Sequence, residues 1–201
     1  MQNKPSEALI FLENAVAENP AHVAAYLYLG VVYEQLEKAD EAIAVYRRIL
    51  PGAGNLSANV ANNLGNVYFQ KGNNEMAEQY YSQAVESNSV FALAYLGRAN
   101  TRIRKGDLRN AVSDYEQYLA LEPRTPQRPR IEQVVALIRA EFAAEERKRL
   151  LAEEEERKRA EERQRLLDEV SASLQSAADA SKGISSGSEN VEGYENEFEL
   201  E

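Results

Sequence analysis

Residues 58–91 read ANVANNLGNVYFQKGNNEMAEQYYSQAVESNSVF, and this stretch decides the fold of the chain. Apolar residues recur at helical spacing on both sides of Gly72, where the backbone can turn. Gly65 lies in the middle of the first half, and Ala77 and Tyr81 lie in the second half. Small residues let two helices approach closely, and an aromatic ring fills the space beside that contact. The stretch therefore predicts a hairpin of two packed helices.

The same layout occurs once before and once after this stretch. The earlier copy starts at Val23 and the later one at Ala92, so successive starts lie 35 and 34 residues apart. A period of this size is typical of stacked helix hairpins. A small residue, an alanine and a tyrosine keep their register in every copy, at Gly30, Gly65, Ala99, Ala42, Ala77, Ala111, Tyr46, Tyr81 and Tyr115.

Residues 4–20 match only the second half of such a copy. Ala8 and Pro20 stand where the last copy has Ala111 and Pro123. One apolar side of the predicted helix therefore lacks a neighbour. This arrangement fits a fragment of a longer protein, a cap or a dimer surface, and we favour a fragment or domain boundary.

With these marks the chain resembles the tetratricopeptide-repeat (TPR) family over residues 5–123. The resemblance implies an all-α fold, a right-handed α-solenoid of helix hairpins whose first helices line a concave groove. The chain departs from the family at Glu37, where a turn glycine is usual, and at Arg98 and Arg102, which replace apolar or aromatic residues. The implied domains are a partial repeat at 4–20 and full repeats at 23–56, 58–91 and 92–123.

The region after the repeats is predicted to have four parts. Prolines in 124–130 indicate a linker, and apolar residues at helical spacing in 131–144 indicate a helix that caps the last repeat. Glutamates and basic residues four apart along 145–178 sustain a solvated helix. Glycine, serine, asparagine and glutamate dominate 181–201, which predicts a disordered acidic tail.

One apolar stripe interrupts the charged helix near its end. Leu167, Val170, Leu174 and Ala177 follow the 3-4-3 spacing of a coiled coil, but they cover barely two heptads. We therefore expect a single helix with weak self-association at this end.

Composition argues against several classes of function. The net charge of −10 is the wrong sign for a nucleic-acid binder, and the chain has no cysteine to ligate a metal or act as a nucleophile. The one histidine, His22, falls in a predicted surface turn. We predict that the chain is not an enzyme and has no catalytic residue, metal or cofactor.

The sequence lacks an apolar run of about 18 residues, the least that a membrane-spanning helix needs. We therefore expect no membrane insertion. The expected location is the cytoplasm, or the periplasm if a signal precedes this chain.

The family resemblance also implies which side chains face a partner. These groove residues are Tyr28, Val31, Gln35, Asn59, Asn62, Asn63, Asn66, Phe69, Asn100, Ile103 and Arg104. An amide both donates and accepts, so we hypothesise that Asn59, Asn63, Asn66 and Asn100 bind the main chain of an extended peptide. The alternative is that some of these asparagines cap or solvate their helix. Leu93 and Gly97 occupy two positions of the family's basic clamp for acidic chaperone tails, so such tails are disfavoured.

Two functions fit these observations. The first is a non-catalytic adaptor that holds a protein or peptide partner in the groove. The alternative is an assembly protein that self-associates through the half-repeat or the C-terminal helix.

Overall fold

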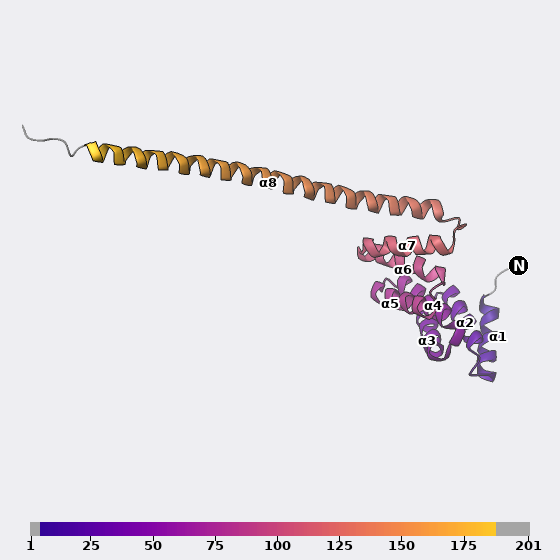
Figure 1. Cartoon of the computed structure of the whole chain (residues 1–201). Helices are drawn as coiled ribbons and strands as arrows, with labels where there is room; N and C mark the ends of the chain where they lie inside the picture. Colours follow the sequence, from indigo (N-terminus) through magenta and orange to yellow (C-terminus); the bar gives the residue numbers. More distant parts are fainter. Residues whose placement is uncertain (1–4, 188–201) are drawn as a thin grey trace, which may run out of the picture. The chain divides into compact units, whose positions relative to one another are not determined.

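The computed structural model describes residues 5–187 and the side chains of 5–181 (Figure 1). Every regular element in that range is helical, and the chain divides into two compact units, Met1–Ala140 and Glu141–Glu201. The elements are α1 Pro5–Glu18, α2 Val23–Gln35, α3 Ala39–Ile49, the 3₁₀ turns η1 Leu50–Gly52 and η2 Gly54–Leu56, α4 Ser57–Gln70, α5 Asn74–Ser87, α6 Ala92–Lys105, α7 Leu108–Leu121 and α8 Arg128–Gly187.

The first unit is a stack of helix hairpins. Helices α2 and α3, α4 and α5, and α6 and α7 pair most extensively, while α1, α3 and α5 each contact the first helix of the following hairpin. The first helices of consecutive hairpins, α2 with α4 and α4 with α6, are also neighbours. This arrangement confirms the predicted all-α solenoid, in which α1 packs on α2 as α3 packs on α4.

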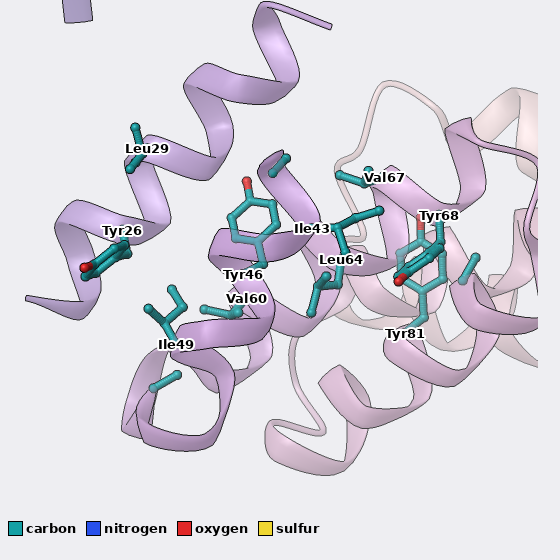
Figure 2. Close-up of a cluster of buried hydrophobic side chains, with 13 residues drawn as sticks. Tyr26, Leu29, Ile43, Tyr46, Ile49, Val60, Leu64, Val67, Tyr68 and Tyr81 are labelled. Carbon is teal, nitrogen blue, oxygen red and sulfur yellow. The ribbon is translucent and has the colours of Figure 1, made fainter. Parts of the chain in front are cut away.

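A small residue beneath a tyrosine ring brings the two helices of a hairpin together. A Cβ atom added to Gly65 on α4 would lie 2.7 Å from the Tyr81 ring of α5, and one added to Gly30 would overlap Tyr46. Tyr46 and Tyr81 are buried among aliphatic side chains such as Leu64 (Figure 2). The glycines are therefore required by space and not by backbone conformation.

The hairpin turns differ between the repeats. Gly72 and Gly106 occupy the left-handed region, at φ 76° and 78°, and the following Asn73 and Asp107 accept a backbone N–H to cap the next helix. The first full repeat has Glu37 at φ 58° and then Lys38, whose side chain makes no cap bond. This turn therefore carries both backbone strain and an uncapped helix.

Arg98 and Arg102, which depart from the family pattern, belong to a charge network around the buried Asp114. Arg98 on α6 binds both oxygens of Asp114 on α7, at 2.9 and 2.8 Å. Arg102 joins Asp114 at 2.7 Å and Glu78 on α5 at 2.9 Å, and Lys105 reaches the other Glu78 oxygen. Burial acts to raise the pKa of Glu78, but the bonds from Lys105 and Arg102 outweigh it and lower that pKa.

The second full repeat fills the equivalent space with rings. Tyr68 and Tyr80, which stand where the third repeat has Arg102 and Asp114, stack with centroids 5.5 Å apart. The third repeat thus has charge pairs where the second repeat has an aromatic contact. The two arginines are tolerated there because each helix packed beside α6 supplies an acid, Glu78 on α5 and Asp114 on α7.

Helix α8 begins at Arg128, inside the segment 124–130 that the prolines had marked as a linker. Pro129 is compatible with the first turn of a helix, because the N–H that proline lacks would be unpaired there anyway. Arg128 binds the Leu119 carbonyl oxygen at 2.8 Å, and Arg139 pairs with Glu116 of α7. The buried side chains of these first turns are Ile131, Val135 and Ile138.

The described part of the second unit is the continuation of α8. The helix runs through 144 and 178 without a break and ends at Gly187, so residues 181–187 are helical and not part of a disordered tail. The rest of that predicted tail lies outside the described residues. Pairs four residues apart, such as Glu154 with Lys158 and Arg157 with Glu161, lie along its exposed surface. Within 5–187, no helix has the length and apolar character of a membrane span.

The strained turn gives the first prediction. We expect Glu37→Gly with Lys38→Asn to raise the free energy of unfolding by about 1–2 kcal/mol, since it removes left-handed strain and adds an N-cap. Urea denaturation monitored by circular dichroism measures the change. The matched control, Gly106→Ala, places a side chain in the same backbone conformation and should destabilise by about 1 kcal/mol. An unchanged midpoint in the double variant would contradict the account.

Candidate functional site

The first helices α2, α4 and α6 carry the residues predicted to face a partner. Tyr28 is 62% exposed, and Gln35 and Arg104 are also exposed. The half-buried members of the set are Val31, Asn59, Asn63, Asn66, Phe69, Asn100 and Ile103. Asn62 differs because it is only 6% exposed and, within the described residues, its buried side-chain oxygen has no hydrogen-bond partner. We therefore remove Asn62 from the partner-binding set.

Two of the asparagines are held by tyrosine hydroxyls of the second helices. The Tyr81 hydroxyl of α5 donates to Asn66 Oδ1 of α4 at 2.8 Å, and the Tyr115 hydroxyl of α7 donates to Asn100 Oδ1 of α6 at 2.7 Å. Both bonds join the twenty-fourth and ninth positions of one repeat. Each bond occupies the amide oxygen and leaves the amide nitrogen as a donor.

The first full repeat makes a different bond because Val31 stands at its ninth position. Here the Tyr46 hydroxyl donates to Glu34 Oε1 at 2.5 Å and accepts from the Asn63 amide at 3.3 Å. Burial raises the pKa of Glu34, and the bond from Tyr46 offsets only part of that rise. Figure 2 shows the Tyr46 ring between the helices with its hydroxyl at one edge of the core.

These bonds change the interpretation of the asparagines. Asn63, Asn66 and Asn100 do more than solvate their helices, because each fixes a core tyrosine from the groove side. The amide nitrogen of Asn63 donates to the Tyr46 hydroxyl. Asn66 and Asn100 instead accept a tyrosine hydroxyl with their amide oxygens. Among the described hydrogen bonds none uses the amide nitrogen of Asn66 or Asn100.

A cavity of about 470 Å³ lies where α6, α7 and the start of α8 meet. Leu96 and Ile103 of α6 form part of its apolar lining, and Asn100 and Tyr115 add polar atoms. The remaining walls come from Gln127, Arg130, Ile131 and Val134. Sequence reasoning placed Asn100 and Ile103 in the site but missed the contribution of α8, although the apolar spacing from Ile131 was the available signal.

Arg104 and Phe69 form a second fixed element between adjacent repeats. The Arg104 guanidinium lies 3.5 Å from the Phe69 ring centroid and donates to the Phe69 carbonyl oxygen at 2.9 Å. The interaction ties α6 to α4 and leaves a cationic group at the surface.

Gly97 lacks a side chain because its α-carbon packs directly against the core. A Cβ atom at this residue of α6 would overlap the Tyr81 ring of the preceding repeat. Tyr81 is therefore enclosed by Gly65 from its own repeat and by Gly97 from the next. A basic side chain at 97 would have to displace this core ring.

His22 has a structural place. Its Nδ1 accepts the backbone N–H of Ala25 at 3.1 Å and caps α2. Over the described residues, no cluster of three or more histidine, cysteine, aspartate or glutamate side chains could hold a metal ion.

Family models of the tetratricopeptide repeat match residues 23–89 and 62–129. Together the matches span all three full repeats and reach the start of α8. The chain therefore belongs to the tetratricopeptide-repeat family. None of the curated proteins compared with the chain matches it.

Solved structures with the same fold include MamA and TPR domains of RPAP3. A crystal structure of MamA has 21% sequence identity and a TM-score of 0.59, over 67% of this chain and 77% of that one. The first TPR of Spaghetti (RPAP3), bound to the HSP90 peptide SRMEEVD, has 26% identity and a TM-score of 0.54, over 60% of this chain and 93% of that one. The first TPR domain of human RPAP3 has 27% identity and a TM-score of 0.52, over 61% and 98%.

The enclosure of Tyr81 gives a stability prediction. Gly97→Ala should lower the free energy of unfolding by about 1–3 kcal/mol, because the added methyl group overlaps a buried ring. Gly52→Ala is the matched control, since open space surrounds that glycine and its φ is not positive. We expect the control to lie within about 0.5 kcal/mol of wild type in urea denaturation. Equal effects of the two substitutions would be inconsistent with this packing.

The buried tyrosines give a pH prediction. Burial raises the pKa of Tyr81 above its ordinary value of 10.0, so the folded state keeps a proton that the unfolded state loses. The free energy of unfolding should therefore fall as pH rises above about 10. Urea denaturation at several pH values from about 9 to about 11 tests this. Tyr81→Phe should make the fall shallower, and an unaltered slope in that variant would assign the effect to other groups.

Proposed function

We propose that this chain is a non-catalytic interaction scaffold that binds an extended peptide segment of a partner protein along α4 and α6. The observation that carries the proposal is the 470 Å³ cavity at the end of that surface, with Leu96, Ile103 and Ile131 on its walls. Its volume lies in the range of small-ligand pockets and leaves room for a large apolar side chain of a peptide.

The polar atoms on the first helices α4 and α6 suit a main chain. The amide nitrogens of Asn66 and Asn100 are oriented by tyrosine hydroxyls on the opposite end of each amide. Carbonyl oxygens of an extended peptide would accept from these donors with little dependence on the peptide's side chains. The apolar side chain in the cavity would then decide which peptides bind, and the amides would align the peptide main chain along the helices.

A hydrogen bond that orients a side chain before the partner arrives reduces the conformational entropy lost on binding. A side chain that is already immobilised loses little rotamer freedom when it meets its partner, and that loss is about 0.5–1.5 kcal/mol for a mobile side chain. Tyr81 and Tyr115 therefore act in the proposed site by positioning Asn66 and Asn100, and Tyr115 also lines the cavity.

The peptide that the Spaghetti domain binds is acidic. The present chain has Leu93 and Gly97 at two positions where the family's acidic-tail clamp requires basic residues, and Tyr81 occupies the space beside Gly97. We infer that the partner segment is recognised mainly by an apolar side chain and its main chain.

A peptide library displayed on phage and selected on the full chain tests the proposal. Selected peptides should contain a recurring large apolar residue. Their affinity should fall at least about tenfold, a loss of about 1.4 kcal/mol, in Ile103→Glu, which places a charge in the cavity. Val90→Glu is the control, because Val90 is exposed and does not line the cavity.

Arg130→Glu provides a second variant that preserves folding, since Arg130 is exposed and also lines the cavity. It should weaken binding without moving the thermal unfolding midpoint. Peptides that bind both cavity variants as tightly as wild type, or a selection that yields no binder, would refute the proposed site.

A further inference from the structure

The C-terminal part of α8 carries an exposed apolar stripe, formed by Leu167, Val170, Leu174 and Ala177. The first three side chains are 54%, 56% and 66% exposed. Their spacing places Leu167 and Leu174 at a positions and Val170 and Ala177 at d positions of a heptad repeat. The structure extends this helix to Gly187, beyond the end expected from sequence, so the stripe lies inside a helix and not at its frayed end.

The residues that border the stripe are uncharged. The e and g positions beside it are Leu166, Ser171, Ser173 and Ala178. The charged residues of the same turns, Asp168, Glu169 and Asp179, fall at the outward b, c and f positions. A copy of the same helix can therefore approach this face without bringing like charges together.

The preceding part of the helix has no comparable face. Its glutamates and basic residues pair along the helix, as Glu154 does with Lys158 at 2.7 Å and Glu155 with Arg159 at 3.8 Å. These charges are satisfied within one chain. Pairing between chains is thus confined to the stripe and its immediate flanks.

The flanking residue Arg163 distinguishes the two orientations of such a pair. It stands at the d position one turn before Leu167. Two parallel helices in register would place Arg163 directly opposite its own copy, which is unfavourable in a core position. Two antiparallel helices related by a twofold axis at residue 172 place Arg163 opposite Ser181 instead.

The antiparallel arrangement also matches side chains by size. Leu167 then faces Ala177 of the other copy, and Val170 faces Leu174. A large side chain opposite a small one fills the layer evenly, as a packed core requires. The stripe is therefore complementary to itself in this orientation.

We propose that two copies of this chain pair through the apolar stripe as a short antiparallel coiled coil centred on residue 172. The pair brings two peptide-binding units into one particle. A partner with two binding segments would gain affinity from the second segment through its high effective concentration. The pairing itself rests on α8 alone and stands independently of the peptide site.

Cysteine cross-linking tests both the pairing and its direction, because the chain has no cysteine of its own. Leu167→Cys and Ala177→Cys are made as separate variants of the full chain. In the antiparallel pair, residue 167 of one copy faces residue 177 of the other. Two copies of residue 167 are offset by about 15 Å along the axis, beyond the roughly 7 Å that a disulfide spans between Cα atoms.

A mixture of the two variants should therefore form disulfide-linked dimers several-fold more efficiently than either variant alone under mild oxidation. Glu169→Cys, at an outward position, is the control and should remain uncross-linked whether alone or mixed. Efficient cross-linking of each variant by itself would overturn the antiparallel arrangement. Equal, low cross-linking of all samples would overturn the pairing.

Sedimentation equilibrium gives a second readout that does not depend on cysteine. At high concentration the wild-type mass should approach twice the 22.5 kDa of one chain. Val170→Glu with Leu174→Glu should remain at the monomer mass, with the helical circular dichroism retained because glutamate favours helices. A wild-type chain that stays monomeric at every concentration, or a dimer that survives the double substitution, would contradict the proposal.

Discussion

The close approach of two helices beneath a tyrosine ring is the contact on which the repeat unit depends. Tyr46 packs on Gly30, and Tyr81 packs on Gly65. The ring fills the space that the missing side chain leaves, and the hydroxyl reaches past the contact to the opposite helix surface. One side chain thus joins the hydrophobic core to the face that carries the proposed site.

This geometry links stability to recognition. A buried tyrosine needs a partner for its hydroxyl, because an unbonded buried polar group is costly. Asn66 and Asn100 supply acceptors from the groove side, and their own orientation is fixed in return. The asparagines therefore serve the fold and the proposed site at once, and their low helix propensity is offset by the bonds that they make.

The two units show opposite ways of placing charge. In the first unit Asp114 of α7, which is 3% exposed, is neutralised by Arg98 and Arg102 of the neighbouring helix α6. Along 141–181 the charges are exposed and pair within one helix. Burial makes the first network sensitive to loss of any member, whereas the solvated pairs contribute little individually.

The repeats and the family could be predicted from the sequence alone. Glycine, alanine and tyrosine recur in register every 34 or 35 residues, and these types are required locally at each hairpin contact. The start of α8 was less predictable, because a proline such as Pro129 marks either a break or the first turn of a helix. Contacts with α7 decided between the two.

The candidate site, like the fold, was predicted from the sequence only in part. The sequence determined that asparagines gather on the first helices, since the repeat register assigns each one to a face. Only the tertiary structure decided that Asn62 is buried, that Asn66 and Asn100 are bound by tyrosines, and that α8 completes the cavity. The physical reason is that a helical period assigns a residue to a side of its own helix, whereas burial and bonding depend on the helix packed beside it.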